Sequence, residues 1–154
     1  MALDVGDSIP GFTLPTDSGG NLSSSDIAGK TAVLYFYPKD NTSGCTKQAQ
    51  GFRDALDDFA SAGATVIGVS PDGVASHDKF KAKQDLNFTL ISDEEKSLCE
   101  AFGVWKEKSM YGKKYMGVER STFLIDDKGV IRQAWRKVKV PGHVAEVLEA
   151  AKSV

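Results

Sequence analysis

The fold of this chain is constrained most by short apolar runs that alternate with stretches of helical periodicity. Residues 31–37 and 64–70 are apolar enough to predict two buried strands. Between them, apolar residues recur at helical spacing and predict a long helix over residues 46–62, which Gly63 ends. Two strands joined through a helix lie parallel in one sheet, so this part of the chain predicts an α/β fold.

The rest of the chain continues the alternation. The turn-rich residues 5–30 predict an N-terminal β-hairpin, and residues 104–118 predict an irregular, partly exposed hairpin. Helices are expected over residues 74–84, 94–102 and 141–152, and strands over 88–91, 119–125 and 130–135. We therefore expect a central mixed β-sheet flanked by helices, with the N-terminal β-hairpin, in a single domain over residues 1–154.

The composition is that of an ordinary globular protein. Of the 154 residues, 41% are hydrophobic and 26% are charged, and the net charge is −2. This balance gives no electrostatic reason to expect a nucleic acid or an anionic membrane as a partner, and no apolar run approaches the length of a membrane span. The N-terminus lacks the basic and apolar regions of a signal peptide, so we expect a cytoplasmic location, where both cysteines are reduced.

One of the two cysteines stands where chemistry is expected. Cys45 follows the strand over residues 31–37 and a turn-forming loop that contains Pro38 and Gly44, and it precedes the long helix. The free backbone N–H groups and the positive dipole end of a helix N-terminus stabilise a thiolate placed there. Because the thiolate is the nucleophile, the sequence predicts an activated cysteine.

The residues around Cys45 resemble a known family. A β-α-β unit with a cysteine at the first helix, closed by a β-hairpin and a helix, resembles the thioredoxin fold. Pro38, Thr42 and Cys45 match the pattern Pro-x-x-x-Thr-x-x-Cys of peroxiredoxins, and residues 35–46 resemble the bacterioferritin comigratory protein/peroxiredoxin Q subgroup. Further stretches that match this subgroup are residues 68–72, 90–93, 102–105, 110–113, 120–126 and 137–140.

The resemblance implies a thiol peroxidase that reduces hydrogen peroxide and organic hydroperoxides. Cys45 would be the peroxidatic cysteine, which attacks a peroxide oxygen and becomes a sulfenic acid. Thr42 would hydrogen-bond the peroxide and the thiolate, Pro38 would shield the sulfur, and Arg120 would place a guanidinium beside it. The neighbouring Glu119 either orients this guanidinium or is a solvated charge.

The sequence departs from the subgroup in the second half of the cycle. Many members carry a resolving cysteine five positions after the peroxidatic one, where this chain has Gln50, and others carry it near residue 81, which is Lys81. The remaining cysteine, Cys99, is expected to be a buried apolar thiol, with a role as resolving cysteine as the alternative. We therefore expect an external thiol, such as thioredoxin, glutaredoxin or glutathione, to reduce Cys45.

Two other classes of function compete with a peroxidase. A disulfide reductase of the thioredoxin type needs a Cys-x-x-Cys pair, and position 48 is Gln48. A redox sensor or binding module without turnover would need Cys45 but not Thr42 and Arg120, so the presence of all three favours catalysis. The resemblance further implies a monomer.

The remaining polar and aromatic residues suggest no second site. His77 and His143 show no metal-ligand spacing with the cysteines, so no metal or other cofactor is expected, and His77 is expected to be solvated on a surface helix. Trp105, Tyr111 and Tyr115 either form a docking surface or cover an edge of the core, and we favour the second interpretation.

Overall fold

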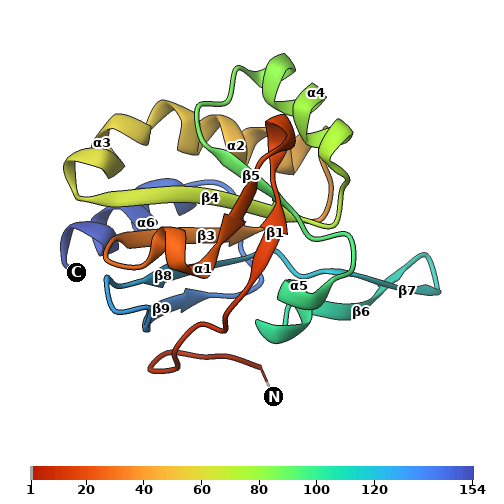
Figure 1. Cartoon of the computed structure of the whole chain (residues 1–154). Coiled ribbons are helices and arrows are strands. Elements are labelled where there is room, and N and C mark those ends of the chain that lie inside the picture. Colours follow the sequence, from red (N-terminus) through yellow and green to blue (C-terminus); the bar gives the residue numbers. More distant parts are fainter. Residues whose placement is uncertain (1) are drawn as a thin grey trace.

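The computed structural model of the chain describes residues 2–154 and has a five-stranded sheet at its centre (Figure 1). The strand order is β5-β4-β3-β8-β9, in which β3, β4 and β5 are parallel while β8 and β9 join them in antiparallel pairing. The strands are β3 (Thr31–Phe36), β4 (Ala64–Ser70), β5 (Thr89–Ser92), β8 (Ser121–Ile125) and β9 (Ile131–Trp135). The predicted mixed sheet is confirmed, and so is the N-terminal β-hairpin, formed by β1 (Thr13–Pro15) and β2 (Asn21–Ser23).

Helices cover both faces of this sheet. One face carries α2 (Ser43–Asp54), α3 (Leu56–Ser61), α4 (Val74–Gln84) and α6 (His143–Lys152), and the other carries α1 (Ser24–Ile27) and α5 (Ser97–Ala101). Alternate side chains of β3 point to opposite faces, so Val33 and Tyr35 join the core under α2 while Leu34 and Phe36 join the core under α5. None of the helices within residues 2–154 is both long enough and apolar enough to cross a membrane.

The long helix predicted over residues 46–62 is two helices. The backbone at Ala55 leaves helical values (φ −96°, ψ 3°), and this kink separates α2 from α3. Phe52 and Phe59 are nevertheless both buried on the same face, as the spacing required. Periodicity shows which face of a segment is buried, but it does not show a break that leaves that face unchanged.

The helix predicted over residues 94–102 begins later, at Ser97. The carboxylate of Asp93 accepts the backbone N–H groups of Leu98 (3.2 Å) and Cys99 (2.8 Å), so it caps α5 from outside the helix. Acidic residues near a helix start are favourable both as caps and within the first turn, and the sequence alone did not separate the two.

Residues 104–118 form a regular hairpin rather than an irregular one. Strands β6 (Trp105–Met110) and β7 (Lys113–Val118) pair antiparallel along their whole length, and Tyr111 and Gly112 both have the positive φ that a tight two-residue turn needs. Trp105 packs against the core as predicted. The prediction that Tyr111 and Tyr115 cover the core is wrong, because they are 97% and 44% exposed on an arm that projects from the body (Figure 1).

We predict that Gly68→Ala lowers the free energy of unfolding by roughly 1–3 kcal/mol, the usual effect of overfilling a packed core. In β4, Gly68 lies between Tyr35 and Leu90, and a Cβ atom there would stand 3.0 Å from the Tyr35 hydroxyl and 2.9 Å from a Leu90 methyl group. Urea unfolding measures the change. The control is Gly11→Ala, whose new Cβ would meet its nearest atom at 4.0 Å; an equal loss in both variants would contradict this account of the packing.

Candidate active site

The loop between β3 and α2 places Cys45 in the first turn of α2. This helix begins at Ser43, after Thr42 in an extended conformation at the N-cap position, so Cys45 is its third residue. The N–H groups of a first turn lack partners within the helix, and the helix dipole is positive there, so both stabilise negative charge. Cys45 is only 1% exposed, and the position predicted for it at the helix start is confirmed.

Arg120 reaches Cys45 from the neighbouring strand. Phe36, at the end of β3, pairs with Ser121, at the start of β8, so Arg120 lies just beyond the end of β3, where the loop to α2 begins. Its Nη2 donates a hydrogen bond to Cys45 Sγ at 3.2 Å. Gly44 permits this approach, since a Cβ at that position would stand 3.2 Å from the same nitrogen. The structure thus brings together two residues that are 75 positions apart in the sequence.

Gln48 is a member of this site that the sequence analysis missed. It lies one helical turn after Cys45, is fully buried, and accepts a hydrogen bond from Arg120 Nη1 at 2.7 Å through its Oε1. Its spacing of three residues from Cys45 was the available signal, because residues at i and i+3 share a helix face. Glu119 does not orient the guanidinium; it pairs with Lys106 at 3.7 Å instead.

Thr42 and Pro38 flank the cysteine in the preceding loop. The Thr42 hydroxyl donates to the Lys39 carbonyl at 2.9 Å and its side chain is exposed, while Pro38 is half-buried. A hydroxyl that donates its only proton to a carbonyl keeps its lone pairs free, so in this structure the oxygen is set to accept a hydrogen bond. No bond from this hydroxyl to Cys45 occurs among the described residues.

Cys99 lies on the opposite side of the sheet from Cys45. Cys45 belongs to the core under α2, whereas Cys99 is fully buried in the core under α5, and both thiols are free. Burial raises the pKa of Cys99, and the charge of Asp93 raises it further, so this thiol stays protonated. The structure does not bring Cys99 to the site.

Polar pairs occupy the two positions where the subgroup carries resolving cysteines. Gln50 Nε2 donates to Gln84 Oε1 at 2.9 Å and ties α2 to α4. Lys81 Nζ donates to Asp17 Oδ2 at 2.7 Å and ties α4 to the short 3₁₀ helix η1 (Asp17–Gly19). Both positions therefore join neighbouring elements in this protein.

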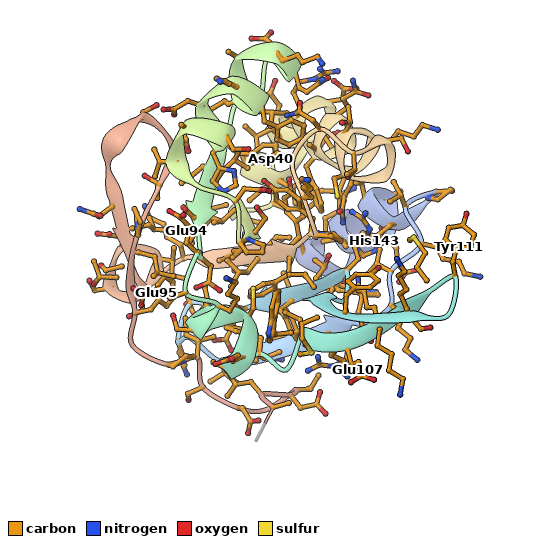
Figure 2. All side chains as sticks on the ribbon, turned by 90° about the vertical axis from the view of Figure 1, so that its right-hand side faces the viewer. Asp40, Glu94, Glu95, Glu107, Tyr111 and His143 are labelled. Carbon is orange, nitrogen blue, oxygen red and sulfur yellow. The ribbon has the colours of Figure 1, made fainter. Side chains whose placement is uncertain are left out.

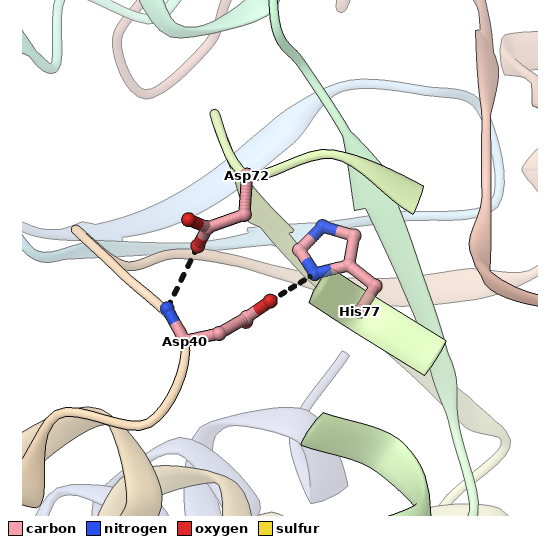
Figure 3. Close-up of side chains that lie close together, drawn as sticks. All are labelled: Asp40, Asp72 and His77. Atoms are coloured by element: carbon pink, nitrogen blue, oxygen red, sulfur yellow. Dashed lines mark hydrogen bonds and ion pairs between the residues drawn. The ribbon is translucent and has the colours of Figure 1, made fainter. Parts of the chain in front are cut away.

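A buried hydrogen-bond network contacts the loop between β3 and α2. It includes His77, which the sequence analysis wrongly predicted to be solvated. His77 is fully buried rather than solvated. Its Nδ1 lies 2.7 Å from Asp40 Oδ2 (Figure 3), and its Nε2 lies 2.9 Å from the Ile91 carbonyl. Both ring nitrogens face acceptors, an arrangement that favours the doubly protonated imidazolium over the neutral ring. Periodicity could not place His77 inside, because its acceptors lie far away in the sequence.

The pKa of His77 moves with this arrangement. Burial alone lowers it, but the hydrogen bond and charge of Asp40, together with the Ile91 carbonyl and the charge of Asp72, outweigh burial and raise the pKa above its usual value. His77 and Asp40 therefore form a buried ion pair directly beneath the loop that leads to Cys45.

Asp40 connects this pair to the loop. Its carboxylate also accepts hydrogen bonds from the Tyr37 hydroxyl at 2.6 Å and the Ser76 hydroxyl at 2.8 Å, and its backbone N–H donates to Asp72 Oδ2 at 2.7 Å. These bonds hold both the side chain and the backbone of Asp40, which lies between Pro38 and Thr42 in the sequence. The network thus fixes the path of the loop across the end of the sheet.

Asp40, Asp72 and His77 are also residues of the kind that hold metal ions. Here a proton lies between His77 and Asp40, and the second ring nitrogen donates to a carbonyl, so the imidazole offers no free lone pair to a metal. The geometry indicates a hydrogen-bonded ion pair.

Comparisons with known proteins identify the family of this chain. The AhpC/TSA family matches residues 5–134. The chain belongs to the AhpC/TSA family. Peroxiredoxin Bcp of Bacillus subtilis is 51% identical over 154 residues, covering 100% of this chain and 98% of the relative, and Peroxiredoxin Bcp of Escherichia coli is 44% identical over 146 residues, covering 95% and 94%.

Solved structures of this family share the fold. Peroxiredoxin Q of Xanthomonas campestris is 50% identical, with a TM-score of 0.88 over 92% of this chain and 90% of the other. A PrxQ mutant of Xylella fastidiosa is 44% identical, with a TM-score of 0.95 over 99% and 98%. The thioredoxin-like fold and the subgroup that the sequence indicated are both confirmed.

We predict that His77 gives this AhpC/TSA protein a stability component that is lost as pH rises. A histidine with a raised folded pKa stabilises the folded state fully below its unfolded pKa of about 6.5, and this contribution disappears as pH rises through the folded value. Urea unfolding of wild type and His77→Gln between about pH 5.5 and 9 should show the difference in unfolding free energy shrinking at high pH. A difference independent of pH would contradict the buried imidazolium.

His143 is a control of opposite sign. Burial lowers its pKa, with the charge of Arg120 in the same direction, although Glu146 opposes them. Because the folded state then disfavours the proton, His143 reduces stability as pH falls below about 6.5. His143→Gln should therefore remove a destabilisation at low pH.

Proposed function

We propose that this chain is a one-cysteine thiol peroxidase in which Cys45 reduces hydrogen peroxide and organic hydroperoxides. The observation that carries the proposal is the Arg120 guanidinium 3.2 Å from Cys45 Sγ in the first turn of α2. Support for organic substrates comes from a 49% identical bacterioferritin comigratory protein of Xanthomonas campestris, whose structures are described for alkyl peroxide reduction activity.

The chemistry follows from the charges around the sulfur. The Cys45 thiolate attacks one peroxide oxygen, an S–O bond forms as the O–O bond breaks, and the departing oxygen leaves as water or an alcohol after taking a proton. Negative charge moves from sulfur to the departing oxygen, and the permanently charged Arg120 stabilises it along this path. The Thr42 oxygen, free to accept, would bind the proton of the hydroperoxide and orient it.

An external thiol then reduces the sulfenic acid. Gln50 and Lys81 occupy the positions of the usual resolving cysteines, and the sheet stands between Cys45 and Cys99. An internal disulfide to Cys99 would require the core on one face to open, because the two Cα atoms of a disulfide lie within about 7 Å. The donor is a thioredoxin, a glutaredoxin or glutathione.

The setting of the reaction follows from the same thiol chemistry. We propose that residues 1–154 act as one catalytic domain in the reducing cytoplasm, which both free thiols favour. The monomeric state stays a prediction.

Two cysteine variants test the roles. Cys45→Ser should abolish peroxide consumption, because the nucleophile is gone, whereas Cys99→Ala should leave the rate of Cys45 oxidation within about twofold of wild type, since the thiol is distant and protonated. Intact mass after one equivalent of peroxide should show a gain of one oxygen in both wild type and Cys99→Ala. A loss of two hydrogens that depends on Cys99 would show an internal disulfide and overturn the one-cysteine cycle.

Arg120→Lys tests the guanidinium. A lysine carries the same charge, but it lacks the planar fork that bonds Cys45 and Gln48 through two separate nitrogens. Stopped-flow oxidation of Cys45 should therefore slow by about 10²–10³-fold, the usual effect of losing a preorganised donor. Arg132→Lys is the matched control, since Arg132 pairs with Asp126 at 3.3 Å and is mostly exposed. Equal rates for wild type and Arg120→Lys would remove the guanidinium from the mechanism.

A further inference from the structure

The large apolar side chains exposed on this protein gather on the β6–β7 hairpin. They are Met110, Tyr111, Tyr115 and Met116, and the remaining two within residues 2–154 are Val5 and Val154, near the chain ends. Exposed apolar patches of this kind mark interaction sites, and methionine and tyrosine are typical of such surfaces.

The strand register divides the hairpin into two faces. Residues directly opposite in an antiparallel pair share a face. We call one of them the basic face; it consists of Lys106, Lys108, Met110, Lys113, Tyr115 and Gly117. The opposite face consists of Trp105, Glu107, Ser109, Lys114, Met116 and Val118.

The two faces differ in charge. On the opposite face, Lys114 pairs with Glu107 at 3.7 Å and the charges cancel. On the basic face, Lys106 pairs with Glu119, but Lys108 and Lys113 have no acidic partner within 4.0 Å in the described part of the chain. The basic face is therefore cationic as well as apolar, and it suits a partner that is acidic and apolar.

The basic face is also next to the Cys45 site. Strand β7 leads through Val118 and Glu119 directly to Arg120. The stem of Lys108 lies over Gly117, where a Cβ would stand 3.4 Å from it, so this lysine is half-buried. Burial lowers the pKa of Lys108, and Arg120 lowers it too, while the charge of Cys45 raises it. Figure 2 shows Tyr111 at the outer tip and Glu107 on the side away from His143.

We propose that the basic face of the hairpin docks the protein dithiol that reduces the Cys45 sulfenic acid, a partner with acidic and apolar residues around its reactive thiol. This inference rests on the proposed function and names its electron donor as a protein. Because Cys45 is buried, the first turn of α2 must open before any donor thiol bonds its sulfur. A partner already held by the adjacent hairpin is in place whenever this turn opens.

The transfer balances with a dithiol as reductant. The donor thiolate attacks the Cys45 sulfenic sulfur, an S–S bond forms, and the S–O bond breaks to release hydroxide, which leaves as water after protonation. The second thiolate of the donor then attacks the first donor sulfur, which is bonded to Cys45 in the mixed disulfide, and Cys45 leaves as a thiolate. The sulfenic acid is reduced, the dithiol is oxidised to a disulfide, and one water is produced.

Adjacent lysines on β7 provide a matched experiment. Lys113→Glu changes the basic face, whereas Lys114→Glu makes the same change of charge on the opposite face. Each variant is oxidised with one equivalent of peroxide and mixed with thioredoxin, with glutaredoxin or with dithiothreitol, and the rate of return to the thiol is measured at several salt concentrations. Tyr115→Ser and Met116→Ser form a second pair that tests the apolar part.

For Lys113→Glu and Tyr115→Ser, we expect the rate of Cys45 reduction to fall about tenfold with whichever of thioredoxin and glutaredoxin reduces wild type faster. For Lys113→Glu, this rate should also depend less on salt concentration. Lys114→Glu and Met116→Ser should stay within about twofold of wild type, and all four should match wild type with dithiothreitol. Docking at the basic face is overturned if Lys113→Glu and Lys114→Glu lower the rate of reduction equally, or if they lower the rate with dithiothreitol as much as with the protein donor. It is also overturned if neither protein reduces oxidised wild type faster than dithiothreitol does.

The first step separates this proposal from the peroxidase itself. Oxidation of Cys45 by peroxide is measured before any donor is added. A failure at that stage would overturn the proposed function, and the docking proposal with it, whereas normal oxidation followed by identical reduction of all variants would overturn only the docking surface.

Discussion

The contact between Cys45 Sγ and Arg120 Nη2 is the interaction on which the functional architecture depends. It joins the start of α2 to the start of β8, and it exists because β8 runs antiparallel beside β3 in a register that pairs Ser121 with Phe36. Gly44 leaves room for the guanidinium, and Gln48 holds its other nitrogen. A cation that cannot lose its proton is thereby fixed beside a buried nucleophile, where water screens the charge less than at the surface.

The loop before Cys45 depends on a second, fully buried charge pair. Asp40 and His77 bond each other beneath the loop, and Tyr37 and the Asp40 backbone extend the bonds to neighbouring elements. A buried ion pair of this kind contributes little net stability on its own, but removing one partner leaves the other charge unpaired. The pair therefore specifies one loop path, and that path sets where Thr42 and Cys45 stand.

The sheet also separates the two thiols. Cys45 in α2 and Cys99 in α5 belong to cores on opposite faces of the sheet, because the strands point alternate side chains to the two faces. The charge of Asp93, whose carboxylate caps α5, adds to burial in keeping the Cys99 thiol protonated. Reduction of Cys45 from outside follows from this layout, and the exposed hairpin beside Arg120 offers the surface on which a donor can act.

The sequence alone determined the elements and the chemistry of single positions. Apolar runs and helical spacing predicted the mixed sheet, its helices and the place of Cys45 at a helix start, because these signals are local. The roles expected for Thr42 and Pro38 came from the resemblance to peroxiredoxins. The sequence did not predict the kink at Ala55, the late start of α5 or the regular pairing of β6 with β7. Each of these depends on backbone details that leave the apolar pattern unchanged.

Only the tertiary structure decided which distant side chains meet. The burial of His77 against Asp40 was mispredicted and the role of Gln48 was missed, since a polar residue can enter a core only when its partner is there, and the partner is fixed by topology. The separation of Cys99 from Cys45 has the same origin. Local spacing predicts which residues form each helix and strand. Strand order and register decide which of these elements are neighbours, and the site lies where the end of β3, the start of α2 and the start of β8 come together.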